Sequence, residues 1–112
     1  MDLADYQKLC ARSAAKYDDR EKEIMVLGLG IAGEAGDVAG CVKKTIGHND
    51  QQIAGIKENL GDTAWYIAMI CNHYGWSMNE VLTENIDKLK KRYPKGFTAE
   101  DAQASKRRDW NE

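Results

Sequence analysis

Four acidic residues near the middle of the chain have the types and spacing needed to hold a metal ion. Glu34 and Asp37 lie three positions apart, and Glu58 and Asp62 lie four positions apart. Residues three or four positions apart share one face of a helix, so each pair points in one direction. If the two helices pack antiparallel across the short break at residues 47–50, the four carboxylates meet at one place.

A cation is expected where these carboxylates meet, because burying unpaired charges of one sign is expensive. Oxygen ligands carried on rigid helices suit the hard cations Mg²⁺ and Mn²⁺. The residues alone therefore predict a metal-dependent enzyme that acts on a phosphorylated substrate.

The composition predicts one ordinary globular domain covering residues 1–112. The chain has 112 residues, of which 43% are hydrophobic and 30% charged, values typical of a small globular domain. The net charge of −2 argues against a polyanion binder that works by bulk electrostatics. Cys10, Cys41 and Cys71 are far apart and form no CxxC motif. They are expected to be reduced thiols, which predicts a cytoplasmic protein.

Neither a signal peptide nor a membrane span is expected. Asp2, Asp5 and Lys8 interrupt the N-terminal residues before an apolar run can form. The longest stretch without Asp, Glu, Lys or Arg covers residues 63–79, which is shorter than the roughly 20 apolar residues that a transmembrane helix needs. We therefore expect no contact with a membrane.

The apolar pattern predicts an all-α fold, a four-helix bundle without strands. Apolar residues recur at steps of three and four in residues 3–17, 24–45, 51–74 and 78–93. The expected stops are Gly47, Gly75 and Pro94. Asn49 or Asp50 is expected to cap the third helix, and residues 77–80 form a capping box for the fourth. Thr98 with Asp101 is expected to cap a short fifth turn.

Residues 28–33 spell GxGxxG, the pattern of a dinucleotide-binding loop. That loop requires a strand before it and a βαβ unit around it, and the rest of this chain predicts helices only. We therefore reject the dinucleotide-binding interpretation. Glycines inside a helix let another backbone or a ligand come close, and Gly33 and Gly36, which flank Glu34, are the positions where we expect such an approach.

Three motifs give the chain a resemblance to the MazG-like all-α nucleoside triphosphate pyrophosphohydrolases. The first is Glu34-Ala-Gly-Asp37, with Asp where the family has a second Glu. The second is Asn59-Leu-Gly-Asp62, with Asn where the family has Glu. The third is Asn85-Ile-Asp-Lys88 followed by Arg92-Tyr-Pro-Lys-Gly-Phe97. Each motif alone is moderately specific, but the three in this order are a strong signal.

The resemblance implies cleavage of an NTP or dNTP between the α and β phosphates, giving the monophosphate and pyrophosphate. It implies Mg²⁺, with Mn²⁺ as a substitute, and a homodimer or homotetramer, for which Tyr6, Met69 and Met78 offer apolar surface. Four carboxylates are the expected catalytic residues: Glu34, Asp37, Glu58 and Asp62. Metal ligands are expected from Glu34, Asp37 and Asp62, with Glu58 or Asn59 completing the shell. The expected substrate-binding residues are Asn85, Lys88, Arg92, Tyr93 and Trp65.

Two alternatives stay open at this point. Trp65 and the neighbouring Tyr66 fit the apolar core as well as they fit a base-stacking role. The basic segment 88–95 also fits a non-catalytic helical module that binds nucleic acid or protein through an exposed basic helix end. That module leaves the acidic pairs unexplained, and the negative net charge argues against nucleic acid.

Overall fold

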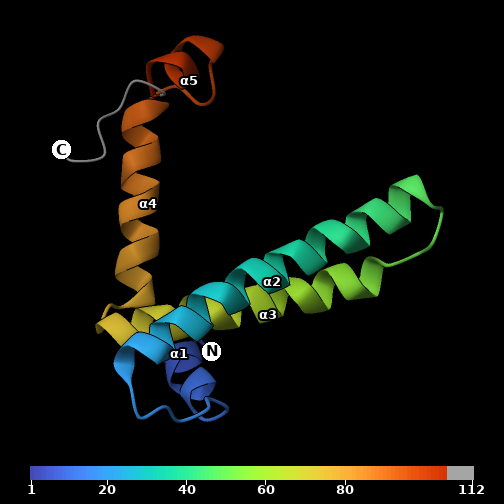
Figure 1. Ribbon diagram of the computed structural model, residues 1–112. Helices are drawn as coiled ribbons and strands as arrows, with labels where there is room; N and C mark the ends of the chain where they lie inside the picture. The colour runs from blue at the N-terminus through green and yellow to red at the C-terminus, as the bar shows by residue number, and fades with distance from the viewer. Residues whose placement is uncertain (106–112) are drawn as a thin grey trace. The chain divides into compact units, whose positions relative to one another are not determined.

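The computed structural model describes residues 1–105, and these residues form five helices (Figure 1). The helices are α1 (Leu3–Ala11), α2 (Arg20–Gly47), α3 (Ile53–Tyr74), α4 (Met78–Arg92) and α5 (Ala99–Ser105). Within these residues there is no strand, and the isolated bridge between Pro94 and Gly96 belongs to a tight turn. The predicted all-α fold is confirmed.

The chain forms two compact units, which are described separately. The first unit covers Met1–Met78 and contains α1, α2 and α3. The second begins at Asn79 and contains most of α4 and all of α5. The carboxylates of the first two motifs all lie in the first unit.

Helices α2 and α3 lie side by side and run in opposite directions, as Figure 1 shows. Three contacts fix their register. The Glu23 carboxylate lies 3.1 Å from the His73 ring nitrogen Nδ1. The Tyr66 ring packs on the backbone at Gly30, and the Cys41 sulfur packs at Gly55. In each pair the two residue numbers add up to 96, so the register is constant along the hairpin. The same register places Glu34 opposite Asp62 and Asp37 opposite Asn59.

Gly30 is the glycine at which a neighbouring side chain comes closest. A Cβ added to Gly30 would overlap the Tyr66 ring, whose Cδ1 would lie 2.8 Å away. By contrast, nothing lies within 4 Å of a Cβ added at Gly33 or Gly36. The helix-to-helix approach expected at those two glycines is therefore wrong, because the Tyr66 ring meets α2 at Gly30. An approach by a ligand there stays a prediction.

Gly30→Ala is expected to destabilise the protein by about 1–2 kcal/mol. Displacing the Tyr66 ring costs about 1–3 kcal/mol as overpacking, and the better helix propensity of Ala returns somewhat less than 1 kcal/mol. Gly28→Ala is the matched control, because nothing lies within 4 Å of its Cβ. The control is expected to stabilise the helix slightly. Urea denaturation of both variants measures the difference, and equal midpoints would contradict the contact.

Gln7 ties α1 to the end of α3 and to the start of α4. Its side-chain amide is buried and donates to the Asn72 Oδ1 and the Trp76 carbonyl, both at 3.0 Å. Its Oε1 accepts from the Met78 backbone N–H at 2.7 Å. Every hydrogen-bonding atom of this amide is used on residues far away in sequence, so the network fixes the position of α1.

Two predicted helix boundaries and one predicted cap are wrong. α1 ends at Ala11 and not near residue 17, because Ser13 leaves the helix to accept a hydrogen bond from Trp65 Nε1 at 2.9 Å. α2 starts earlier than expected, at Arg20, since the Asp19 side chain accepts from the Glu21 N–H. α3 is preceded by Gln52 without a side-chain cap, so neither Asn49 nor Asp50 plays that role.

The other predicted helix ends agree with the structure. α2 ends at Gly47, α4 begins directly after Ser77, and α4 ends just before the Pro94 turn. Gly75 ends α3 with φ 73°, in the left-handed region that favours glycine. Thr98 Oγ1 accepts from the Asp101 N–H at 3.1 Å, which is the predicted cap of α5.

Within residues 1–105, α2 is long and apolar enough, by length and composition alone, to cross a membrane. One such helix is weak evidence, because core helices of soluble proteins and signal sequences share these properties. The expectation of no membrane contact stays a prediction.

Candidate active site

The register of α2 and α3 brings the two acidic pairs together. Glu34 is partly buried, and its pKa is raised first by desolvation and then by the negative charges of Asp62, Asp37 and Glu58. These are the four carboxylates that the sequence singled out. They come from two helices, and the other three lie near enough to Glu34 for their charges to disfavour its ionised form.

The carboxylates are neighbours without forming a preassembled metal site. In the described part of the chain, no three His, Cys, Asp or Glu side chains lie close enough together to hold a metal ion. The donor chemistry nevertheless fits a hard divalent cation, because all four groups offer carboxylate oxygens. A cation would also relieve the repulsion that raises the pKa of Glu34.

Asn59 interacts with α2 through its amide nitrogen. Its Nδ2 donates to the Cys41 Sγ at 3.6 Å, one turn beyond Asp37 on α2. Asn59 is partly buried in the helix interface. An asparagine carbonyl oxygen is a neutral metal ligand where a glutamate would supply a negative charge, so the predicted shell would carry one negative charge fewer with Asn59 as a ligand.

Asn59→Glu is expected to lower the Mg²⁺ concentration needed for half-maximal activity by several-fold. The substitution adds a negative ligand beside Asp62, although it removes the donor to Cys41. The measurement is the initial rate as a function of Mg²⁺, with Asn59→Ala as the companion variant. If both variants keep the wild-type Mg²⁺ requirement, position 59 lies outside the metal shell.

Tyr6 is a neighbour of the carboxylates that sequence reasoning missed. Its pKa is raised to about 12, chiefly by desolvation, next by its hydrogen bond to and charge interaction with Cys10, and last by the charge of Asp62. The spacing of α1 marked Tyr6 only as an apolar position. No signal in the sequence pairs a residue of the first helix with Asp62, because that proximity arises from the packing of α1 on α3.

Trp65 lies at the wall of a cavity. Its Nε1 donates to Ser13 Oγ at 2.9 Å, and its ring packs edge-on against Tyr66 with centroids 4.9 Å apart. Both aromatic side chains line a partly open cavity of about 180 Å³ in the first unit. Trp65 is therefore a fixed wall of a cavity, a position that suits the predicted stacking role.

The remaining predicted substrate-binding residues lie in the second unit. Asn85, Lys88 and Arg92 follow one another at steps of three and four on α4, so they share a face. Tyr93 comes directly after α4, and its ring lies 5.6 Å from that of Phe97. Together with Ile86, Leu89 and Lys90 these two rings line a groove of about 350 Å³.

Comparison with known proteins identifies the family. The MazG nucleotide pyrophosphohydrolase domain matches residues 22–97, more than half of the chain. The chain therefore belongs to the MazG family, and the predicted resemblance is confirmed. The Gene 37 protein of Mycobacterium phage L5 is 28% identical, over 82% of this chain and 90% of the relative. No solved structure matches the chain.

Proposed function

We propose that this protein hydrolyses a nucleoside or deoxynucleoside triphosphate between the α and β phosphates, giving the monophosphate and pyrophosphate. One observation carries the proposal. Glu34, Asp37, Glu58 and Asp62 interact electrostatically across α2 and α3, inside the segment that matches the MazG domain. Four neighbouring carboxylates are costly for stability alone and suit a reaction at phosphate.

The proposed cofactor is Mg²⁺, with Mn²⁺ as a substitute. Glu34, Asp37 and Asp62 would hold it, and Glu58 or Asn59 would complete the shell. When bound, the cation would polarise the phosphates and lower the pKa of water. The carboxylates themselves would orient the attacking water and accept its proton.

Binding of the triphosphate is assigned to the basic face of α4. Asn85, Lys88 and Arg92 would hold the phosphates and stabilise the charge that develops on departing pyrophosphate. In the first unit, Trp65 would contact the nucleoside, and the predicted role of Tyr93 in the second unit stays a prediction.

The experiment is incubation of the full chain with each common NTP and dNTP and Mg²⁺, with pyrophosphate and orthophosphate measured separately. Pyrophosphate is expected as the primary product. Orthophosphate as the primary product, or no turnover of any nucleotide, would contradict the proposal.

A binding module remains the second candidate, favoured by the exposed groove between α4 and the following turn. Phe97 in this groove is 76% exposed, and Lys90 adds charge beside it. A Mg²⁺ titration of thermal stability distinguishes the two functions. A cation that binds only the native state raises its stability, and this module gives no reason for such an increase.

We also propose that the protein is a cytoplasmic homodimer or homotetramer without a membrane partner. The surface that supports self-association differs from the expected one, because Met69 and Met78 are buried and Tyr6 is partly buried. Other apolar side chains are exposed, and those on α2 and α3 include Leu29, Ile46, Ile53 and Leu60. Light scattering during gel filtration measures the oligomeric state, and a monomer at micromolar concentration would contradict the proposed self-association.

A further inference from the structure

The partly open cavity of about 180 Å³ is bounded by three parts of the first unit. The loop after α1 contributes Ser13 and Tyr17, α2 contributes Glu23 and Leu27, and α3 contributes Trp65 and Met69. The lining is mostly apolar, with one carboxylate. Cavities of this kind, with apolar walls and few polar groups, are the usual binding sites for small molecules.

The cavity has the size of one ring system. Its volume is smaller than the roughly 300 Å³ at which sites for drug-sized ligands begin. It is far larger than the roughly 10–15 Å³ that holds one water molecule. A planar one- or two-ring compound fits these limits, whereas a whole nucleotide does not. The Trp65 indole, fixed by its bond to Ser13, supplies an aromatic wall of the kind on which bases stack.

The cavity lies next to the carboxylates along the helix axis. Tyr66 and Gly30, which meet each other, lie one turn from Asp62 and Glu34 respectively. Leu27 and Met69, at the cavity, lie about two turns from the same carboxylates, which is roughly 10 Å at 1.5 Å per residue. A sugar and one phosphate ester bridge a distance of this order. A base in the cavity would therefore place its α-phosphate near the carboxylates.

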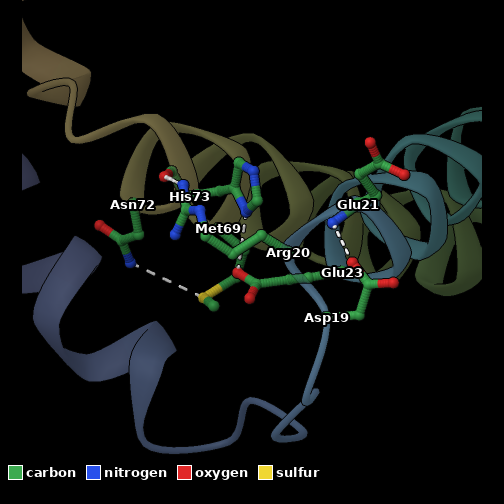
Figure 2. Close-up of polar contacts among 7 residues, drawn as sticks. All are labelled: Asp19, Arg20, Glu21, Glu23, Met69, Asn72 and His73. Carbon is green, nitrogen blue, oxygen red and sulfur yellow. Dashed lines mark hydrogen bonds and ion pairs between the residues drawn. The ribbon is translucent and has the colours of Figure 1, made fainter.

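Glu23 is the group that gives the cavity a chemical preference. One of its oxygens, Oε1, lies 3.1 Å from His73 Nδ1 (Figure 2). This contact holds the end of the side chain in place, and a carboxylate has a second oxygen that accepts further hydrogen bonds. An exocyclic amino group of cytosine, adenine or guanine donates to such an oxygen. Thymine and uracil have no amino group: a carbonyl stands where cytosine carries its amino group, and their one ring N3–H lies between two carbonyls, which a carboxylate repels.

We propose that this cavity binds the nucleotide base and that Glu23 selects bases with an exocyclic amino group. The inference rests on the proposed function, since it takes the substrate to be a nucleotide whose phosphates reach the carboxylates. It adds a substrate class: dCTP, dATP, dGTP and their ribose counterparts are preferred over dTTP and dUTP.

The test compares kcat/KM for dCTP, dATP, dGTP, dTTP and dUTP in the full chain and in Glu23→Gln. The wild type is expected to favour the amino-bearing bases. Glu23→Gln replaces a pure acceptor by a group that also donates, so the preference should fall by about 10- to 100-fold. Glu21→Gln is the matched control, because Glu21 lies two positions away and does not line the cavity. The Glu21→Gln variant should keep the base preference of the wild type.

A second variant and a second measurement guard against a folding defect. Trp65→Ala is expected to weaken binding of every base by about 10-fold or more, since stacking does not depend on base identity. The ratio of binding affinities between any two bases should then stay as in the wild type. Calorimetry with dCMP, dGMP and dTMP reports binding without turnover.

The outcomes separate the two claims. Pyrophosphate release with an unchanged base preference in Glu23→Gln, and unchanged dCMP binding in Trp65→Ala, would overturn the base site and leave the proposed reaction standing. Absence of turnover, together with dCMP or dGMP binding that Glu23→Gln weakens, would support the base site and overturn the reaction.

Discussion

Asp62→Asn is expected to reduce nucleotide hydrolysis by at least about 10³-fold while leaving the fold intact. Asp62 lies opposite Glu34 in the register of α2 and α3, and its charge helps to raise the pKa of Glu34. Under the proposed function, Asp62→Asn would remove a metal ligand, and metal stabilisation of a phosphoryl transition state is worth several kcal/mol, which corresponds to this factor. The measurement is kcat/KM with saturating Mg²⁺.

The same variant should be more stable than the wild type in the absence of divalent cations. Removing one negative charge relieves repulsion within the acidic group, so the thermal midpoint without Mg²⁺ should rise and its increase on adding Mg²⁺ should shrink. Asp18→Asn is the control, because Asp18 is exposed and precedes α2. If Asp62→Asn keeps wild-type turnover, the acidic group is not the reaction centre.

The sequence predicted the acidic site because that site depends on local spacing. Glu34 and Asp37 share a face of any helix that contains them, as do Glu58 and Asp62. The short break between α2 and α3 leaves an antiparallel hairpin as the simplest packing. The register itself was not predictable, since it depends on which residue the Tyr66 ring covers, and α2 contains several glycines besides Gly30.

The residues that the sequence could not identify all depend on contacts between distant segments. Tyr6 reaches the neighbourhood of Asp62 because Gln7 anchors α1 to Asn72 and Trp76. Glu23 lines the cavity because Ser13 leaves the first helix and meets Trp65. Spacing along one helix contains no information about such contacts. The end of α3 at Gly75 and the cap of α5 by Thr98 were predicted correctly, because each depends on residues close to it in the sequence.

Arg92→Ala is expected to lower kcat/KM by about 10²-fold, the largest effect after that of Asp62→Asn. Lys88 and Arg92 lie one turn apart on α4, so both can contact one polyphosphate. Loss of a single preorganised donor to a developing negative charge costs about 10²–10³-fold. Arg92→Lys should recover part of the activity, because it restores the charge but not the two-pronged geometry of the guanidinium. Steady-state kinetics with the best nucleotide of the panel provides the measurement.

Lys90→Ala is the matched control, and it also decides between the enzyme and the binding module. Lys90 is exposed and lies two positions from both Lys88 and Arg92, so it is on the opposite face of α4. A phosphate-binding face predicts that Lys90→Ala leaves kcat/KM unchanged while Arg92→Ala lowers it sharply. A module that attracts a polyanion through the charge of segment 88–95 predicts similar losses for each cation removed, because such binding follows the number of charges and not their geometry. Equal effects of the two alanine substitutions would therefore favour the module.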